Sequence, residues 1–299
     1  MNSKPNVGYI GLGLMGKSMA RNILQAGFPL FIHNRSLEAV NELVEEGAVA
    51  AQSPAEVARQ VDIVFTNLPD SPDVMKVALD DGGIIESLRP GMVFVDNSTI
   101  KPETARVIAQ VFQERGAFSL DAPVSGGDIG ARDGTLTIMV GGPEEGLERA
   151  MPVLRAIGKS ITHVGESGTG QIAKAANQIM VAAQMIAMGE LLIFAKKSGA
   201  DPEKVVDAIR GGAAQCWSLD VKTPRFFKGN REPGFKAYMQ AKDLAIVMDT
   251  ACTYGIPLPA AAVHTQLYNA MLEMGMKELD NSAVIGVIES LSGISLLDS

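Results

Sequence analysis

Residues 7–16 read VGYIGLGLMG, in which a short apolar run leads directly into the spacing G-x-G-x-x-G. Gly11 lets the chain turn sharply off a strand, Gly13 lets the backbone approach a pyrophosphate, and Gly16 lets a helix lie close to the sheet. An amphipathic stretch follows, and its free N–H groups favour phosphate. This order predicts a dinucleotide site rather than an incidental glycine-rich turn. The residues expected to contact the cofactor are Gly11, Leu12, Gly13, Leu14, Met15 and Gly16.

The next apolar run, Leu30 to His33, predicts a second strand, and Asn34-Arg35-Ser36 follows it. Proteins that prefer NAD place a carboxylate here for the ribose 2′-hydroxyl. No acid stands here to repel a 2′-phosphate, while a guanidinium and a hydroxyl can bind one. These residues therefore favour NADP(H), with NAD as the less preferred cofactor. The alternative is a helix start in which Ser36 is the N-cap and Arg35 is solvated.

Bulk composition restricts the class of protein. The 299 residues are 46% hydrophobic and 20% charged, which is ordinary for a globular chain with room for two domains. The net charge of −8 argues against a nucleic-acid partner. We expect no membrane span, since no run approaches the necessary ~18 apolar residues. The first strand begins so early that no signal peptide is expected, which predicts a cytoplasmic protein.

Cysteine and histidine are too scattered to suggest a cluster. Cys216 and Cys252 lack C-x-x-C spacing, and His33, His163 and His264 lie far apart. We therefore expect neither a disulfide framework nor a metal site. The chemistry is left to other side chains.

Apolar segments recur through the first half of the chain and predict further strands at residues 61–66, 93–96, 119–122, 136–140 and 160–164. Helical stretches separate most of them, which is typical of a doubly wound α/β sheet of the Rossmann type. Several strands end in polar or glycine-rich loops, at residues 67–69, 97–99 and 123–127. Ligands bind outside the carboxyl ends of such strands, so these loops should line the site. A dinucleotide-binding domain is predicted over residues 1–164.

The pattern changes near Gly165. Residues 168 to about 199 read as one long helix that is apolar nearly all round, and no strand pattern follows it. About 30 helical residues would reach roughly 45 Å, enough to span two domains. An all-helical domain over residues 165–299 is predicted, with this helix buried in it or against a second subunit of a homodimer or homotetramer.

Three further segments are expected in this domain. Helices should begin at Asp201-Pro202 and at Pro259 and include residues 241–248. Residues 223–235 are predicted to form a basic loop containing Pro and Gly. This loop is either a solvated surface or a lid that attracts an anionic substrate.

Lys174 and Asn177 are the candidates for chemistry near the start of the long helix. A nicotinamide enzyme that moves hydride to a carbonyl needs a group to protonate the developing alkoxide. A lysine among small and apolar residues can serve if burial lowers its pKa. Asn177, at i+3, lies on the same helical face and could orient the substrate. Taken alone, a lysine in this position is usually only solvated.

Four motifs together resemble the β-hydroxyacid dehydrogenase family. They are Gly11 to Gly16, the stretch DAPVSGG at residues 121–127, Gly168 to Asn177, and AKDL at residues 241–244. This family includes 3-hydroxyisobutyrate dehydrogenase, tartronate semialdehyde (2-hydroxy-3-oxopropionate) reductase and the glyoxylate and succinic semialdehyde reductases. The resemblance spans residues 7 to about 290, and four ordered motifs are far more specific than one.

The resemblance implies roles residue by residue. Lys174 would be the catalytic acid/base, and Asn177 would help to orient the substrate. Ser125, Gly126 and Gly127 would bind the substrate carboxylate through a hydroxyl and backbone N–H groups. Lys242 would complete the cleft near cofactor and substrate. The residues expected to line the cofactor are Leu68, Pro69, Asp73, Thr99 and Phe235. The structural alternatives are a plain turn at residues 125–127 and a surface ion pair at Lys242-Asp243.

Two signals disagree on the substrate. Residues 215–220, which contain Trp217, are similar to the Cys-Trp-Ser stretch of 3-hydroxyisobutyrate dehydrogenases, and Trp217 is therefore a candidate substrate contact. Asn34-Arg35-Ser36 instead resembles NADP-dependent semialdehyde and glyoxylate reductases. The expected activity is NADP(H)-dependent reduction of small semialdehydes, with NAD(P)-dependent 3-hydroxyisobutyrate dehydrogenase as the alternative. A non-catalytic dinucleotide-binding module is a third reading, which the presence of Lys174 disfavours.

Overall fold

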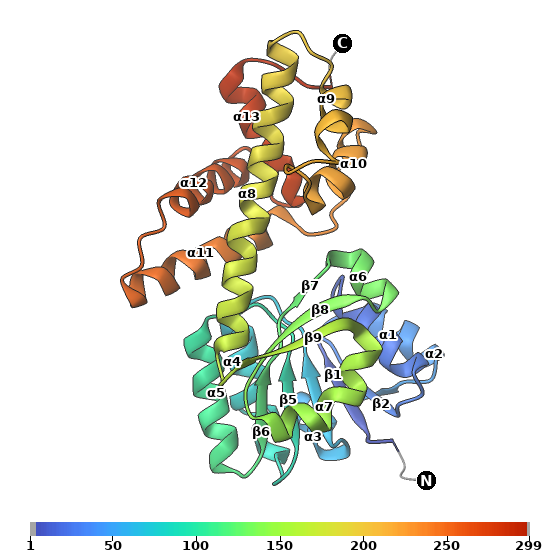
Figure 1. Ribbon diagram of the computed structural model, residues 1–299. Coiled ribbons are helices and arrows are strands. Elements are labelled where there is room, and N and C mark those ends of the chain that lie inside the picture. The colour runs from blue at the N-terminus through green and yellow to red at the C-terminus, as the bar shows by residue number, and fades with distance from the viewer. Residues whose placement is uncertain (1–3, 298–299) are drawn as a thin grey trace. The chain divides into compact units, whose positions relative to one another are not determined.

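The chain divides into two compact units, residues 1–174 and 175–299. A computed structural model describes residues 4–297, and Figure 1 traces them along the chain. The division falls inside one long helix, past residue 164, so the start of that helix groups with the sheet. Each unit has its own hydrophobic core.

The first unit is built on a parallel sheet. Its strands are β1 (Val7–Ile10), β2 (Leu30–His33), β3 (Val49–Ala50), β4 (Ile63–Thr66), β5 (Val93–Asp96) and β6 (Phe118–Asp121). They are hydrogen-bonded in the order β3-β2-β1-β4-β5-β6 and all run parallel. This is the strand order of a Rossmann fold, and it confirms the predicted fold class.

The sheet continues with a mixed edge, in which the sequence indicated two strands but neither the third, β7, nor the antiparallel pairing. Its strands are β7 (Val124–Ser125), β8 (Leu136–Gly141) and β9 (Gly158–Gly165). β8 is antiparallel to both β6 and β7, whereas β9 is parallel to β8. The single pair that joins β6 to β8 is Asp121 with Gly141. Because β7 returns at once from the end of β6, residues 121–127 lie at the carboxyl edge of the parallel strands.

Helices cover both faces of the sheet. They are α1 (Gly16–Gln25), α2 (Glu38–Glu45), α3 (Pro54–Gln60), α4 (Ser71–Leu79), the 3-10 helix η1 (Ile84–Ser87), α5 (Pro102–Glu114), α6 (Gly127–Asp133) and α7 (Glu144–Ile157). The alternation of β5 shows the two faces: Val93 and Val95 pack with α1, α2 and α7, while Phe94 packs with α3, α4 and α5. Strands buried on both faces read as largely apolar runs, as β1, β4 and β5 do.

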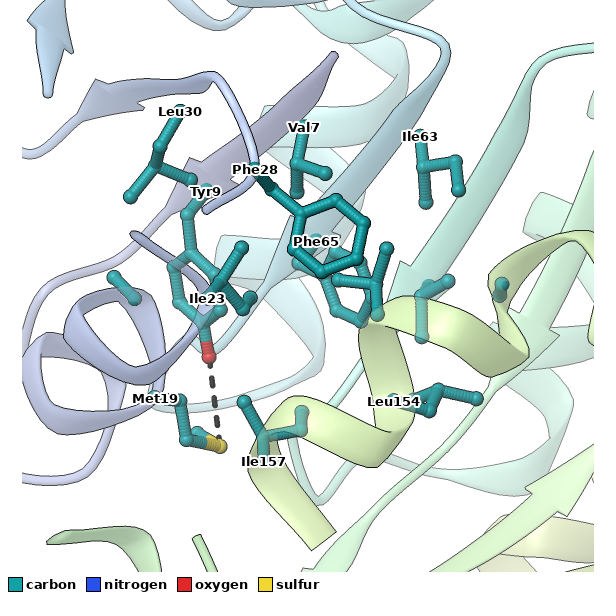
Figure 2. Packing of buried hydrophobic residues seen from close by; sticks show 14 of the residues in the cluster. Val7, Tyr9, Met19, Ile23, Phe28, Leu30, Ile63, Phe65, Leu154 and Ile157 are labelled. Carbon is teal, nitrogen blue, oxygen red and sulfur yellow. Dashed lines mark hydrogen bonds between the residues drawn. The ribbon is translucent and has the colours of Figure 1, made fainter. Parts of the chain in front are cut away.

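Figure 2 shows the first of these cores. The rings of Tyr9 and Phe65 stack with centroids 6.0 Å apart, and the Tyr9 hydroxyl donates to Met19 Sδ at 3.6 Å. Burial, and secondarily the charge of Asp96, raises the pKa of Tyr9 well above its usual value. The strand that precedes the glycine loop, β1, is thus held in place by the contacts of Tyr9 with β4 and α1.

The second unit is helical. Its elements are α8 (Thr169–Lys197), which begins in the first unit, then α9 (Pro202–Ile209), the π-helix η2 (Ser218–Lys222), α10 (Thr223–Phe227), α11 (Ala237–Tyr254), α12 (Pro259–Glu273), the 3-10 helix η3 (Asn281–Val284) and α13 (Ile285–Ser292). Between residue 175 and residue 297 the only β-type pairing is an isolated bridge between Lys236 and Asp280. The predicted all-α character is confirmed.

Helix α8 departs from two expectations. It is long and apolar enough to cross a membrane by length and composition, with a mean hydropathy of 1.7 over its best window, so the expectation that no segment reaches this level is wrong. Half of that window is buried inside the protein, as in an ordinary core helix. Nor is α8 buried all round in the single chain, because Met180 and Phe194 are exposed. Contact with a second subunit stays a prediction.

Two local expectations are also wrong. The N-cap of α2 is Leu37, without a side-chain cap, so Ser36 does not start that helix. The predicted loop at residues 223–235 begins with a short helix, α10, because Pro224 occupies its first turn, where a missing N–H costs nothing. Only the residues from Lys228 onward connect α10 to α11 without helix.

Candidate functional site

The glycine loop between β1 and α1 has the features that a pyrophosphate needs. Gly11 adopts a φ of 98°, and a Cβ at Gly16 would collide with the Gly11 carbonyl oxygen. At Gly13, by contrast, no described atom beyond its chain neighbours lies within 4 Å of where a Cβ would stand. The N-cap of α1, Met15, provides no side-chain cap. The loop is therefore closely packed at Gly11 and Gly16 and open at Gly13. The N–H groups at the start of α1 are available to an anion.

Asn34, Arg35 and Ser36 lie beside this loop because β2 is the parallel neighbour of β1. Asn34 Oδ1 accepts from Leu12 N at 3.0 Å, and its amide donates to Ser36 O at 3.0 Å and Ser36 Oγ at 2.9 Å. Asn34 thus holds the turn and the glycine loop together. The side chain of Arg35 is 82% exposed, with Nη1 3.6 Å from Asp73 Oδ1. Of the three side chains only Arg35 is charged, and its guanidinium is open to solvent.

The loops after β4 and β5 meet at the same edge of the sheet. Leu68 N donates to Ser98 Oγ at 2.8 Å, which ties the loop of Leu68 and Pro69 to the loop of Ser98 and Thr99. Asp73 lies in the first turn of α4, beside the capping residue Asp70. The structure therefore brings the predicted cofactor residues of the first unit to the carboxyl ends of β1, β2, β4 and β5.

A buried carboxylate beneath these loops was missed by the sequence analysis. Asp96 Oδ1 accepts from Thr66 Oγ1 at 2.7 Å and from Ser98 Oγ at 2.6 Å. Burial raises the pKa of Asp96 to about 6, although the hydrogen bonds from Ser98 and Thr66 oppose this shift. Asp96 fixes the hydroxyl that binds Leu68 N. Its position as the last residue of β5, facing the ligand edge, was the available signal.

Ser125, Gly126 and Gly127 form the turn between β7 and α6. Gly126 has a φ of 136° and Gly127 a φ of 64°, both in the left-handed region that favours glycine. Ser125 is the last residue of β7, and Gly127 begins α6. The segment is therefore a specific turn from strand to helix that places a hydroxyl and consecutive backbone N–H groups together.

Lys174 lies directly against this turn. Its side chain is buried, at 7% exposed, and Nζ donates to the Val124 carbonyl oxygen at 2.8 Å. Val124 immediately precedes Ser125 in the chain. The expected proximity of the lysine and the Ser125–Gly127 turn is thus present within the first unit, and the reading of Lys174 as a solvated surface lysine is wrong.

Asn177, Trp217, Phe235 and Lys242 belong to the second unit. Asn177 Nδ2 lies 3.4 Å from Gln178 Oε1, and Gln178 Nε2 donates to Asp243 Oδ2 at 2.7 Å. Lys242 Nζ is 3.0 Å from Asp243 Oδ1, but Asp243 is only 2% exposed, so a surface ion pair is the wrong description. The Gln178–Asp243 bond instead fixes α11 against α8.

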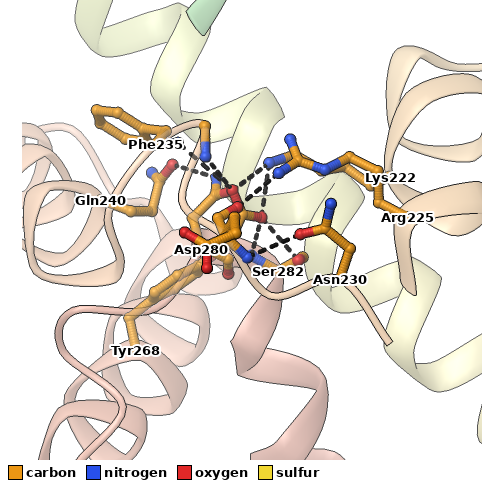
Figure 3. Close-up of polar contacts among 11 residues, drawn as sticks. Lys222, Arg225, Asn230, Phe235, Gln240, Tyr268, Asp280 and Ser282 are labelled. Atoms are coloured by element: carbon orange, nitrogen blue, oxygen red, sulfur yellow. Dashed lines mark hydrogen bonds and ion pairs between the residues drawn. The ribbon is translucent and has the colours of Figure 1, made fainter. Parts of the chain in front are cut away.

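A buried ion pair, also missed by the sequence analysis, holds the segment that contains Phe235 (Figure 3). Lys222 Nζ donates to both oxygens of Asp280, at 2.6 and 2.7 Å, and both side chains are almost fully buried. Asp280 Oδ2 also accepts from Gly234 N at 2.9 Å and from Phe235 N at 3.4 Å. Burial would raise the pKa of Asp280, but the Lys222 charge and hydrogen bonds lower it overall.

The same ion pair lies beside Trp217. Lys222 Nζ is 5.5 Å from the centre of the Trp217 ring, which is 46% exposed. The Asp280 cluster therefore supports two of the predicted contacts of the second unit, Trp217 and Phe235. Within residues 4–297 no group of three or more His, Cys, Asp or Glu side chains is placed to hold a metal ion.

Comparison with known proteins identifies the family. Residues 6–165 match the model of the NAD binding domain of 6-phosphogluconate dehydrogenase, and residues 168–288 match the model described as NAD-binding of NADP-dependent 3-hydroxyisobutyrate dehydrogenase. The 2-hydroxy-3-oxopropionate reductase of Escherichia coli is 40% identical, covering 97% of this chain and 99% of that protein. The chain belongs to the β-hydroxyacid dehydrogenase family.

Solved structures agree with this assignment. The 3-hydroxyisobutyrate dehydrogenase of Mycobacterium tuberculosis with L-serine has a TM-score of 0.88 and 32% identity, covering 96% of this chain and 99% of that chain. A complex of Psf3 with NADP+ and 2-OPP has a TM-score of 0.87 and 27% identity over 94% and 99%. This β-hydroxyacid dehydrogenase is therefore an oxidoreductase that binds a nicotinamide dinucleotide and acts as an NAD(P)-dependent hydroxyacid dehydrogenase.

Proposed function

We propose that this dehydrogenase uses NADP(H) to reduce small carboxylate-bearing semialdehydes, such as tartronate semialdehyde, glyoxylate and succinic semialdehyde, to hydroxy acids. The observation that carries the proposal is the 2.8 Å hydrogen bond from Lys174 Nζ to the Val124 carbonyl oxygen. It holds a buried amine beside a turn whose hydroxyl and N–H groups suit a carboxylate. A proton donor and an anion anchor next to each other are what a semialdehyde acid requires.

The residues of the first unit take the following parts in the reaction. Ser125 Oγ and the N–H groups of Gly126 and Gly127 bind and orient the substrate carboxylate. Lys174 donates a proton to the carbonyl oxygen as it becomes a hydroxyl, and accepts that proton in the reverse direction. The bound cofactor supplies the hydride. The hydrogen bond to Val124 O holds the Lys174 amine beside the turn, so that the proton donor is positioned before the substrate binds.

In the second unit, Asn177, Lys242 and Trp217 are proposed to contact the substrate, and Phe235 and Lys242 to contact the cofactor. Asn177 lies one turn after Lys174 on α8, which supports its role in orienting the substrate. The Lys222–Asp280 pair supports the backbone at Phe235.

Arg35 supports the choice of NADP(H). Its guanidinium is exposed at the edge of the glycine loop, where the ribose of a bound dinucleotide lies in this fold. Ser36 Oγ stands next to it, and no carboxylate follows β2 directly. The structure of Psf3 with NADP+, a relative of the same fold, is consistent with this preference.

An NAD(P)-dependent 3-hydroxyisobutyrate dehydrogenase is the second candidate. The exposed Trp217, in a stretch similar to that of 3-hydroxyisobutyrate dehydrogenases, favours it. Relatives that carry this name include the Mycobacterium tuberculosis enzyme. Both candidates use the same acid/base and anion turn, and they differ in the group that the pocket accepts beside the reacting carbon.

Steady-state kinetics with a panel of substrates tests the proposal. Glyoxylate, tartronate semialdehyde and succinic semialdehyde would be reduced with NADPH and NADH, and 3-hydroxyisobutyrate would be oxidised with NADP+ and NAD+. We expect the highest kcat/KM for a semialdehyde with NADPH. A higher kcat/KM for 3-hydroxyisobutyrate would select the second candidate, and no turnover of any substrate would refute both.

Lys174→Met tests the acid/base within the same assays. The side chain keeps its approximate volume but loses the proton, so kcat should fall by about 100-fold or more while NADPH affinity changes little. Lys159→Met, at an exposed lysine on β9 of the same unit, is the control and should keep full activity. Turnover close to wild type in Lys174→Met would contradict the mechanism.

A further inference from the structure

We propose that Asp121 is a positioning residue that caps the start of α8 and thereby sets the place of Lys174 relative to the Ser125–Gly127 turn. The proposal rests on the acid/base role of Lys174 in the proposed function. Asp121 itself lies among backbone groups and is only 3% exposed. We therefore assign it no direct part in the chemistry.

The cap consists of two hydrogen bonds. Asp121 Oδ1 accepts from Gly168 N at 2.7 Å, and Oδ2 accepts from Gln171 N at 2.9 Å. The first N–H groups of a helix have no partner within it, and a carboxylate there also interacts favourably with the helix dipole. Burial raises the pKa of Asp121 to about 6 against these backbone donors. The carboxylate is therefore mostly ionised at neutral pH.

No local side chain replaces this cap. The residue before α8 is Gly168, which has no side chain, and the Thr169 hydroxyl donates to Glu166 O at 2.7 Å. The usual source of an N-cap, a Ser, Thr, Asp or Asn at the helix start, is thus missing or occupied. The capping group comes instead from the end of β6, far back in the sequence.

The residues around Asp121 and the start of α8 are packed so closely that two positions have no space for a Cβ atom. A Cβ at Gly141 would stand 2.7 Å from both Asp121 Oδ1 and Gly170 N. A Cβ at Gly170 would collide with the Asp121 carbonyl oxygen and lie 2.6 Å from Met139 O. The two glycines let the first turn of α8 approach β6 and β8 backbone to backbone.

The cap and the catalytic lysine join the same two segments. Lys174 lies one turn beyond Gln171 on α8, and its Nζ binds the carbonyl of Val124, three residues after Asp121. The α8 start is thus fastened to residues 121–124 at both ends of one helical turn. A rotation or slide of α8 would break one of these contacts, so Asp121 controls where the amine stands beside Ser125.

The side chain of Gln171 holds the helix start from a second side. Its Oε1 accepts from Ile100 N at 3.1 Å, and its Nε2 donates to Ser98 O at 2.8 Å. Ser98 in turn binds Leu68 N, in the loop assigned to the cofactor. The start of α8 is therefore placed relative to both the anion turn and the cofactor loops.

Asp121→Asn tests the proposal, because the amide keeps the shape but turns donors toward the Gly168 or Gln171 N–H. Two measurements are made on the full chain. Amide exchange of residues 168–176 should be faster than in the wild type. In single turnovers of NADPH with glyoxylate or succinic semialdehyde, the rate constant of NADPH oxidation should fall about tenfold or more, with NADPH affinity within about twofold of wild type.

Comparing the rate constant of NADPH oxidation with its amplitude distinguishes a positioning role of Asp121 from an effect on folding. A variant that is merely less stable contains fewer active molecules, which lowers the amplitude and leaves the rate constant unchanged. Asp201→Ala removes a comparable cap, which accepts from Glu203 N and Lys204 N of α9, and serves as the control. Its rate constant should equal that of the wild type.

An unchanged rate constant in Asp121→Asn, or unchanged exchange at the α8 start, would overturn the proposal. If Asp121→Asn does not fold, Gly141→Ala displaces the carboxylate but retains its charge, and the same two expectations apply to it. A wild-type enzyme that turns over no substrate of the panel would refute the proposed function instead. The exchange measurement would still report on the cap.

Discussion

At the residue scale, neighbouring residues in the turn after β2 have different roles. Asn34 was predicted to bind the cofactor, but its side chain is engaged with Leu12 N and Ser36, so its observed contacts shape the loop. Arg35 is left exposed beside Asp73, in a position to meet a phosphate. Because exposed charges are screened by water, its contribution to cofactor choice should be moderate.

Arg35→Ala should therefore raise the KM for NADPH by roughly 5- to 10-fold, equivalent to about 1 kcal/mol, and leave the KM for NADH nearly unchanged. The reason is that only NADPH carries the 2′-phosphate. Initial-rate kinetics with both cofactors would measure the two values. Arg155→Ala, at an exposed arginine near the end of α7, is the control. Equal losses with NADPH and NADH would show that Arg35 supports the turn rather than the phosphate.

Residue identity alone predicts only part of this site. Gly11, Gly13 and Gly16 are recognisable because their spacing reflects local backbone geometry. Lys174 was found through the resemblance to a family, since nothing in the sequence shows that its amine is buried against Val124. Asp96 and Asp121 were not selected at all, because their partners, such as Ser98 and Gly168, are brought to them by the sheet.

At the scale of elements, the second unit depends on a contact between distant segments. Lys222, at the end of η2, and Asp280, just before η3, are joined by the folding of the chain between them. Asp280 also caps η3 through Ser282 N at 3.1 Å. One carboxylate therefore connects η2, the segment before α11, and η3.

Asp280→Asn should destabilise the second unit by about 3–5 kcal/mol, because it removes the carboxylate charge that pairs with the buried Lys222 ammonium. The unfolding midpoint in urea would measure this loss. Glu278→Gln removes a neighbouring but exposed ion pair, with Lys236 at 2.9 Å, and should cost less than about 1 kcal/mol. A similar small effect of both substitutions would contradict the role given to Asp280.

Elements differ in how far they could be predicted. β1, β2, β5 and α12 were located almost to the residue, because a short apolar run or a Pro at the helix start marks them. β3 and β7 have two residues each and exist only through pairing with neighbours, so no local pattern reveals them. The short α10 was read as part of a loop, and the π-helix η2 was not predicted, since the geometry of both depends on packing against residues far away in the sequence.

At the scale of the whole molecule, the two units should respond to acid in opposite directions. In the first unit, burial raises the pKa of Asp96 and of Asp121 to about 6. In the second, the pKa of His264 is lowered by burial, and that of Asp280 is lowered because the Lys222 interactions outweigh the effect of burial. The sign of each shift determines whether the folded or the unfolded state binds more protons.

Between about pH 6 and 4 the folded first unit binds protons that its unfolded state, with carboxyl pKa values near 3.9, does not. Its stability should therefore rise as the pH falls through this window, with each of the two carboxyls contributing on the order of 2 kcal/mol across it. The second unit should lose stability below about pH 6.5, because His264 binds a proton more readily in the unfolded state, and again below about pH 4 as Asp280 is protonated.

Calorimetric scans at pH 7 and pH 5 would measure these opposite shifts as movements of the unfolding transitions. Asp96→Asn identifies the transition of the first unit, because it removes one of the two titrating carboxyls and should reduce that unit's pH dependence by about half. His264→Gln should flatten the response of the second unit between pH 7 and pH 5 and leave the first unit unchanged. A first unit that loses stability between pH 6 and pH 5 would mean that Asp96 and Asp121 remain ionised there, held by their hydrogen bonds from Ser98, Gly168 and Gln171 more strongly than burial opposes them.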